Sequence, residues 1–500
     1  MMSPAPLASF VLERARSDLY GAYCRNRLVE LLEIDAASGC DALLRLIQHE
    51  VREVAGGLAR IGSTGTGLIV QAGEGDPHRV LVVDVPAPGP HFVPRSTGDR
   101  VFGRGAAGGA AQAVLALAVL KLLGELRTRI HEPPAPVAVV FAAGGPPADV
   151  PAGPAVILVP SGGAVHRAQA GCVGVRVSFS GERALELYPF VAQAMEVESS
   201  RFQTESQARG GPPDLAWDAL TQLNFGRLGP FGSHPALACE RVSVRVRIQA
   251  GANPERIAMR MSEVLDATLP EYTRRRSDLV GQIDPMTGEP KLRRHYALSF
   301  EPARDALYYR IDVFGRRAYG ACVGEADSAI AKAAFIFAAL LRVARNFPNV
   351  RAEAALIEGR AGPIDLEAVQ WFGPPHDAAS IRRRLTAAAH SGLAQYHQIS
   401  GRAVPRDAVR VEFPAPQQEP MHAPSGALAD VFRAAFETAG VPWTAPSAWA
   451  GPSAAAGVAD GGRPMVFFGP GRLERAGTDH ECIEVPEIQQ ALAILTLAAL

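Results

Sequence analysis

The residues of this chain that could do acid–base or metal chemistry are few and lie far apart in the sequence. Asp84 stands near the end of an apolar run, and His480 and Glu481 are neighbours close to the C-terminus. Carboxylates and imidazoles are the groups that most often transfer protons or bind metal ions in active sites. No Ser–His–Asp or Cys–His order accompanies them, so nucleophilic catalysis has no evident set of residues. With Tyr319 added for a reason given below, the catalytic candidates are Asp84, Tyr319, His480 and Glu481.

Several short motifs surround these residues and follow one another in a definite order. They are VLVVDVP at 80–86, VFGRGAAGG at 101–109, a strand-like run at 137–141 followed by Ala-Ala-Gly-Gly, Val159 before Pro160-Ser161, and Gly469-Pro470-Gly471 before Gly477 and Glu481.

In their order and spacing these motifs resemble the M20 family of zinc-dependent peptidases and amidohydrolases, which includes dipeptidases, acetylornithine deacetylase and succinyl-diaminopimelate desuccinylase. The resemblance covers nearly the whole chain. It implies that Asp84, an Asp that orients the metal ligands in the family, is retained, as is the stretch 103–106. It also implies that the five ligands and the general base are replaced, by Val82 and Gly477 for His, Gly108 for the bridging Asp, Gly144 and Gly145 for a Glu-Glu pair, and Val159 for a carboxylate.

The chemical consequence of these replacements is direct. A zinc ion in a catalytic site needs about three protein ligands, drawn from imidazole, carboxylate or thiolate groups. Without the ion no water is brought to a pKa near 7, and no carbonyl is polarised by a metal. Asp84 cannot hold a metal alone, because residues of its kind only orient ligands. We therefore expect no metal and no other cofactor.

Composition limits the classes of partner. Lys and Arg number 50 against 51 Asp and Glu, so the net charge is −1 and nothing indicates nucleic-acid binding. The six cysteines form no Cys-x-x-Cys pair, which is typical of a reducing cytoplasm. The N-terminus has no signal-peptide pattern, and no uninterrupted run of 18 apolar residues suggests a membrane partner. Richness in Ala, Arg, Gly and Pro is typical of a high-GC bacterial genome, and we expect a cytoplasmic location.

Periodicity predicts an α/β fold. Apolar runs at 80–85, 137–141 and 155–159 are typical of strands covered on both faces, and 110–126 reads as a buried helix between two of them. Strands that alternate with helices predict a three-layer sandwich with a mostly parallel central sheet. The first domain is expected to comprise residues 1–170 and 416–500.

The segment 171–415 changes character and predicts an inserted α+β lid domain. Alternating strands at 173–180, 241–248 and 307–314 are interspersed with helices such as 253–269, which suggests two tandem halves from an internal duplication. A doubled lid resembles the PepV-like dipeptidases of the M20 family and implies a monomer. The same resemblance places Tyr319 where the family has a His that steadies the substrate.

Four further residues are candidates for ligand binding. Arg245 and Arg247 lie two apart on one strand and therefore share a face, from which family members often hold a substrate carboxylate. Gly469 and Gly471 permit close approach of a ligand to the backbone.

We therefore predict a non-catalytic M20-like protein that binds a peptide, an acyl-amino acid or a protein partner such as an active M20 enzyme, in a regulatory or scaffolding role. The alternative is an enzyme that uses metal-free or displaced-ligand chemistry in the same cleft, as a hydrolase or transferase acting on the amide of a small peptide or N-acyl amino acid.

Overall fold

The chain forms two compact units in a computed structural model. Unit 1 comprises Met1–Gln169 and Met421–Leu500, and unit 2 comprises Ala170–Pro420. The sequence placed these boundaries after residues 170 and 415. The structure describes residues 4–34, 39–55, 59–64, 67–85, 93–130, 135–143, 150–181, 184–209, 217, 220–248, 254–292, 295–302, 307–322, 324–344, 363–423, 426–451, 453–458 and 462–500.

A nine-stranded mixed sheet forms the centre of unit 1, in the order β1-β2-β6-β3-β7-β19-β8-β17, with β18 also paired to β8. Its middle strands β6, β3, β7 and β19 are parallel, whereas β1, β2, β8 and β17 add antiparallel edges. The strands are β1 (Ala59–Thr64), β2 (Gly67–Ala72), β3 (Arg79–Val85), β6 (Val137–Ala143), β7 (Ala155–Leu158), β8 (His166–Gln169), β17 (Met421–His422), β18 (Ser447–Trp449) and β19 (Met465–Phe468). The sheet is therefore mixed rather than mostly parallel.

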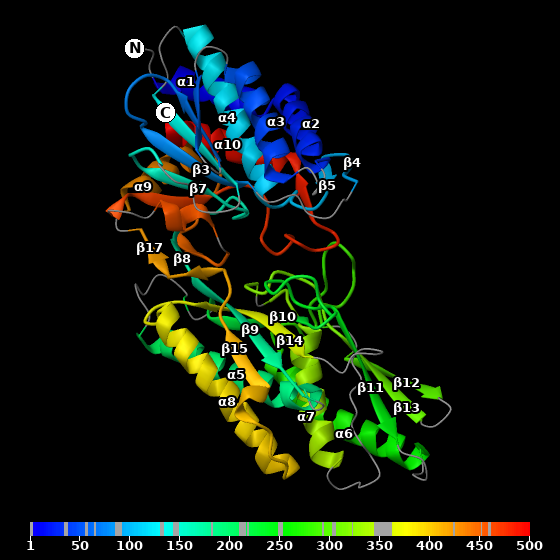
Figure 1. Ribbon diagram of the computed structural model, residues 1–500. Coiled ribbons are helices and arrows are strands. Elements are labelled where there is room, and N and C mark those ends of the chain that lie inside the picture. The colour runs from blue at the N-terminus through cyan, green and yellow to red at the C-terminus, as the bar shows by residue number, and fades with distance from the viewer. Residues whose placement is uncertain are drawn as a thin grey trace. The chain divides into compact units, whose positions relative to one another are not determined.

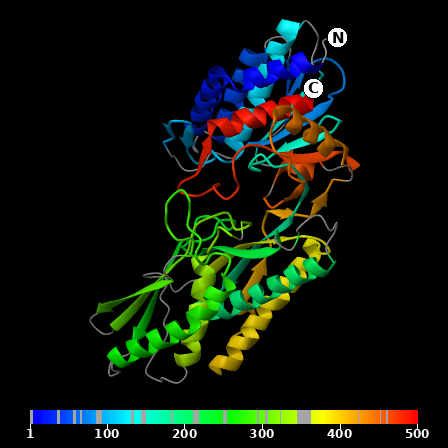
Figure 2. The same cartoon turned by 180° about the vertical axis from the view of Figure 1, so that it is seen from behind.

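The α-helices described for unit 1 are drawn in Figure 1, and all of them contribute side chains to one apolar cluster. They are α1 (Pro4–Ala15), α2 (Asp18–Leu32), α3 (Gly39–Ala55), α4 (Gly109–Ile130), α9 (Ala427–Ala439) and α10 (Val485–Ala499). Figure 2 shows α10, in red, beside the blue α1 and α2, which it contacts although they begin the chain. Helices from both ends of the sequence thus complete one core.

Strand β3 separates two apolar clusters, because successive side chains of a strand point to opposite faces. Leu81 and Val83 join the helical cluster, whereas Val80 and Val82 join the cluster on the other face. That second face carries β18 and the 3-10 helix η5 (Ala454–Gly457) and, among the described residues, no α-helix. The three-layer sandwich predicted a layer of helices on this face, and the described residues of unit 1 do not form one.

Helix α4 is the one described helix that is long and apolar enough to cross a membrane. Its segment Gly109–Arg129 has a mean hydropathy of 1.6, and 78% of its most apolar window is buried inside the structure. It packs against β3, α2, α3 and α10. The sequence predicted a buried helix here, and α4 is a core helix of unit 1.

A three-stranded sheet joins the N-terminal and C-terminal parts of unit 1. Its order is β20-β5-β4, with β4 (Arg95–Thr97), β5 (Arg100–Phe102) and β20 (Cys482–Glu484). Cys482 pairs with Phe102, and the Gly103 N–H donates to the Glu481 carbonyl oxygen at 3.1 Å. This pairing places Glu481 next to the turn that precedes α4.

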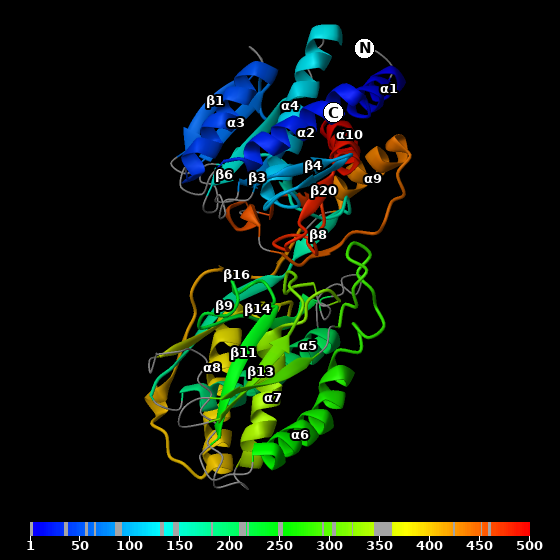
Figure 3. The same ribbon diagram turned by 90° about the vertical axis from the view of Figure 1, so that its right-hand side faces the viewer.

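The described part of unit 2 contains two antiparallel sheets and four long helices, the helices being labelled in Figure 3. The first sheet has the order β10-β14-β9-β15, with β16 also paired to β9, and the second has the order β11-β13-β12. Their strands are β9 (Gly171–Phe179), β10 (Gln222–Leu228), β11 (Arg241–Ile248), β12 (Tyr296–Pro302), β13 (Leu307–Phe314), β14 (Ile364–Phe372), β15 (Val409–Glu412) and β16 (Gln417–Gln418). The helices are α5 (Ala184–Arg209), α6 (Pro254–Arg275), α7 (Ala329–Ala344) and α8 (Ala378–Ser400), and the short 3-10 helix η4 (Arg406–Ala408) precedes β15.

The two halves of unit 2 are nested rather than tandem. Strands β9 and β10 belong to the same sheet as β14 and β15, and the second sheet is built from the chain between β10 and β14. No strand pairing joins the two sheets among the described residues. We expected a monomer because a doubled lid would pair its own sheet edge within the chain. The described strands show no such pairing, and the oligomeric state stays a prediction.

Candidate functional site

Two of the positions at which the resemblance expects metal ligands lie in the apolar core of unit 1. Val82 is fully buried and Val159 is 3% exposed. Both belong to one group of buried side chains, here named the Val82 cluster: Val80, Val82, Ala138, Val140, Ala155, Ile157, Val159, Ala423, Trp449, Ala455, Val458, Met465 and Phe467. Trp449 and Ala455 come from the chain around η5, which contacts β3. Both positions therefore carry hydrocarbon side chains that are buried among other apolar groups.

The two glycine positions of the set, Gly108 and Gly477, lie around the carboxylate of Glu481. Its Oε1 accepts a hydrogen bond from the Ala107 N–H at 3.1 Å, and its Oε2 accepts one from the Gly477 N–H at 3.0 Å. A Cβ placed on Gly108 would be 4.0 Å from Oε1. Burial raises the pKa of the Glu481 carboxyl, while the N–H groups of Gly477, Gly105 and Ala107 and the charge of Arg104 partly offset the rise. The carboxylate is thus bound by the protein's own backbone.

The GPG turn is held against neighbouring parts of unit 1. The Ser161 hydroxyl donates to the Gly469 carbonyl oxygen and accepts from the Gly469 N–H, both at 3.0 Å. A Cβ on Gly469 would collide with Gln112 and the Val159 carbonyl oxygen, and one on Gly471 would lie 2.8 Å from the Ala107 carbonyl oxygen. Close packing of the chain therefore accounts for both glycines, and their role in ligand binding stays a prediction.

The remaining candidates of unit 1 that the structure describes are Asp84 and His480. Asp84 is the exposed residue of β3, and His480 is exposed on the loop before β20. Within the described residues, no group of three or more His, Cys, Asp or Glu side chains could hold an ion. Gly144 and Gly145 lie outside the described residues. The side chains at Val82, Gly108, Val159 and Gly477 do not fit a zinc pair, because none of them offers a ligand atom.

The other candidate residues belong to unit 2. Tyr319 packs its ring against Trp371, with centroids 5.7 Å apart, and burial raises the pKa of its hydroxyl well above the ordinary value. Arg245 forms an ion pair with Glu301 at 2.7 Å across the β11-β13-β12 sheet. The backbone of Arg247 lies in β11, and its side chain is outside the described part of the structure. Arg245 is therefore already paired within the protein.

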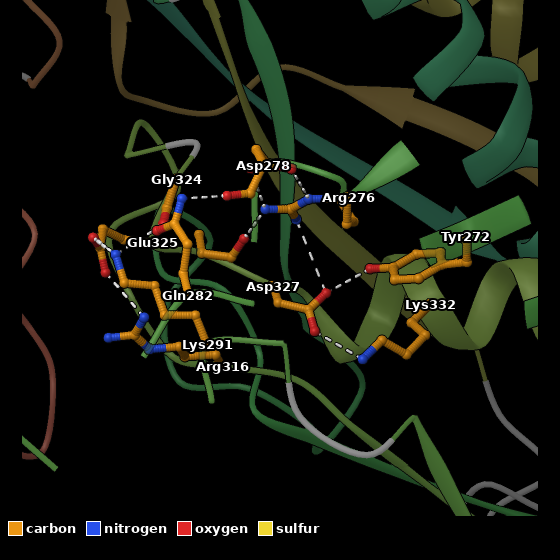
Figure 4. A network of polar contacts seen from close by, with 11 residues as sticks. Tyr272, Arg276, Asp278, Gln282, Lys291, Arg316, Gly324, Glu325, Asp327 and Lys332 are labelled. Atoms are coloured by element: carbon orange, nitrogen blue, oxygen red, sulfur yellow. Dashed lines mark hydrogen bonds and ion pairs between the residues drawn. The ribbon is translucent and has the colours of Figure 1, made fainter. Parts of the chain in front are cut away.

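A buried network of charged groups in unit 2 was not anticipated from the sequence (Figure 4). At its centre the Lys332 ammonium and the Asp327 carboxylate lie 2.7 Å apart, with both side chains fully buried. The Tyr272 hydroxyl donates to Asp327 at 2.6 Å, and Lys332 donates to the Phe314 carbonyl oxygen at 2.5 Å. Desolvation lowers the pKa of Lys332, while the charge of Asp327 partly restores it.

The network extends from this centre to the loop after α6. Arg276 donates to the Ala326 carbonyl oxygen at 2.5 Å and pairs with Asp278 at 3.3 Å. Arg316 pairs with Asp284 at 2.6 Å and with Glu325 at 3.0 Å. The network therefore fixes the end of α6 against the start of α7. The sequence could not predict this network, because the residues that pair in it are up to tens of positions apart and form no local pattern.

Comparison with known proteins supports the fold. No protein-family model and no curated protein sequence matches the chain. Its structure is similar to that of human carnosine dipeptidase 1, with a TM-score of 0.53 and 11% sequence identity over 99% of each chain. It is also similar to the di-peptidase Dug1p from Saccharomyces cerevisiae, with a TM-score of 0.50 and 9% identity over 98% of each chain. The chain therefore shares its fold with these two dipeptidases, which agrees with the fold that the sequence motifs implied.

Proposed function

We propose that this chain is a non-catalytic protein of M20 fold, which binds a small peptide, an acyl-amino acid or a partner protein in a regulatory or scaffolding role. The observation that carries the proposal is the burial of Val82 and Val159 in one apolar cluster. A zinc-dependent hydrolase needs imidazole and carboxylate ligands on an open face of its sheet, with one position left for water. Here buried hydrocarbon side chains stand at two of the six positions, Val82 and Val159. Two more, Gly108 and Gly477, adjoin the backbone-bound carboxylate of Glu481.

The fold supports a choice of the first ligand class to test. The two similar structures are those of dipeptidases, so a small peptide or acyl-amino acid is the first class to test. A protein partner of the same fold, such as an active M20 enzyme, is the second class. We place the protein in the cytoplasm of a bacterium on compositional grounds alone.

Metal-free or displaced-ligand chemistry is the weaker alternative. Glu481 would be the natural acid, but both of its carboxylate oxygens accept backbone hydrogen bonds. A general acid has to deliver its proton to substrate, which these contacts oppose. Asp84 and His480 are exposed and unconnected to each other by any hydrogen bond in the described structure.

The proposal is tested by metal content and turnover. Purified protein, dialysed mildly, should contain well under one zinc ion per chain by elemental analysis. It should not hydrolyse dipeptides or N-acyl amino acids when zinc or manganese is added. Stoichiometric zinc that disappears in His480→Ala, but not in the control His49→Ala on the exposed face of α3, would show that displaced ligands form a metal site.

A further inference from the structure

A pocket of about 380 Å³, lined by both polar and apolar side chains, lies wholly within unit 2. Helix α5 lines it with Val197 and four polar residues, Glu196, Ser199, Ser200 and Gln203, and the spacing of these four places them on one face of the helix. Strand β10 and the start of α7 contribute further polar groups, among them Asn224 and Ser328. The volume is within the lower part of the range for small-molecule sites.

The charged groups of the pocket come from α5 and from the end of α6. Glu196 faces Arg275, Arg276 and the Asp278 that follows them, whereas the pocket residues of β10 and α7 are uncharged. Arg276 is already engaged with Asp278, the Ala326 carbonyl oxygen and, at 3.9 Å, the buried Asp327. This arginine is therefore part of the rigid network that forms the wall.

Glu196 and Arg275 differ from Arg276 in being available to a ligand. No hydrogen bond or ion pair ties the Glu196 carboxylate to any described residue, although the side chain is largely buried. The side chain of Arg275 is 49% exposed, and it pairs at 3.0 Å with Glu271, which is itself on the surface. Such a surface pair is weak and can exchange for a ligand carboxylate. Its guanidinium group also lies 4.9 Å from the centroid of the Phe335 ring, which keeps it at the pocket.

We infer that this pocket binds a small zwitterion, a free α-amino acid or a dipeptide, whose ammonium group pairs with Glu196 and whose carboxylate pairs with Arg275. A largely buried carboxylate without a partner is costly, and an ammonium group removes that cost. The uncharged side chains Leu223, Phe225 and Phe335 then contact the apolar part of the ligand. The pocket belongs to unit 2, so its occupancy does not depend on what the Val82 cluster or Glu481 of unit 1 do.

Protonation of Glu196 gives the site a pH signature. Desolvation raises the pKa of its carboxyl group to about 7, although Arg275 and Arg276 act in the opposite direction. An ammonium ligand requires the ionised carboxylate, whose fraction grows about tenfold between pH 6 and pH 8 for a pKa near 7. The affinity for a zwitterion should rise by about the same factor.

Calorimetric titration of the full chain tests the assignment. The probes are L-leucine, L-methionine, L-arginine, L-glutamate and the dipeptide Ala-Leu, at concentrations up to about 10 mM. At least one should bind, and its N-acetyl and carboxamide derivatives should bind at least about tenfold more weakly, because each lacks one of the two charges. Glu196→Gln and Arg275→Gln should each weaken binding by about tenfold or more.

Two neighbouring substitutions serve as matched controls. Arg274→Gln and Glu263→Gln change exposed residues of α6 outside the pocket and should leave the affinity within about twofold. Circular dichroism confirms that each variant is folded. The assignment is overturned if no probe binds the wild-type chain, if a blocked derivative binds as tightly as its zwitterion, or if both pocket variants bind like the controls.

Discussion

The Glu481 carboxylate accepts a hydrogen bond of 3.0 Å from the backbone N–H of Gly477, four residues earlier in the chain. Its other oxygen accepts from Ala107 at 3.1 Å, so one side chain links the loop before β20 to the turn before α4. In the M20 resemblance Gly477 stands at a ligand position. A carboxylate of the chain thus lies beside this position and receives its hydrogen bonds from backbone groups.

Replacing Glu481 with Gln should destabilise unit 1. The amide NH₂ that replaces one carboxylate oxygen would face a backbone N–H, so a buried donor loses its acceptor. The expected loss in the free energy of unfolding is about 1–3 kcal/mol. Urea denaturation measures it, with Glu474→Gln on the exposed part of the same loop as the control. Equal stability of the two variants would show that these hydrogen bonds contribute little.

Restoring an imidazole at Val82 should also destabilise the protein. Val82 is fully buried among the apolar side chains of the Val82 cluster, and none of these side chains could form a hydrogen bond with the imidazole of a histidine, apart from the indole N–H of Trp449. Val82→His should cost about 2–4 kcal/mol of unfolding free energy, and zinc should not recover it. The control is Val93→His, at a position 66% exposed, which should change stability little. Zinc-dependent recovery of the melting temperature in Val82→His alone would reveal an open ligand site.

The strands and the fold were predictable because apolar runs and glycine motifs are local signals. The runs at 80–85, 137–141 and 155–159 became β3, β6 and β7, and the alternating segment 241–248 became β11. Helix α5 was missed, although it has 26 residues. It contains Pro189, a residue that usually argues against a helix interior. Its buried residues, such as Tyr188, Val191 and Met195, pack against several elements, so the helix shows no single apolar stripe.

For the candidate site of unit 1, the sequence allowed predictions only at positions that the order of the motifs identifies. Sequence order predicted that Val82 and Gly477 are altered ligand positions. It could not show that Val82 would share a buried cluster with Trp449, or that Gly477 would donate a hydrogen bond to Glu481. The pocket of unit 2 depends on Glu196, Asn224, Arg275 and Ser328, which come from four separate elements. Contacts between residues so distant in sequence leave no periodic pattern.

Breaking the buried pair between Asp327 and Lys332 should be more harmful than breaking any surface pair. Asp327→Asn leaves the Lys332 ammonium without a counter-charge in a site where both side chains are fully buried. The expected loss is about 3–5 kcal/mol, against less than about 1 kcal/mol for Asp430→Asn, which breaks the exposed pair with Arg433. Chemical denaturation compares them. A small effect of Asp327→Asn would mean that Lys332 loses its proton readily inside the protein.

Glu196 should make the protein less stable as the pH rises. Its pKa is about 7 in the folded chain, above the ordinary value of 4.5, so between these values the folded chain binds more protons than the unfolded chain. The free energy of unfolding should therefore fall from about pH 4.5 to about pH 7 and change no further through this group. Glu196→Gln removes the effect, so the variant should gain about 1–3 kcal/mol relative to wild type between pH 5 and pH 8, after allowance for the partial exposure of the group. Urea denaturation at pH 5, 6, 7 and 8 measures the difference, with Glu263→Gln as the control. A difference between wild type and Glu196→Gln that stays constant with pH, or grows toward acid, would show that the carboxyl group titrates near its ordinary pKa and that the pocket does not desolvate it.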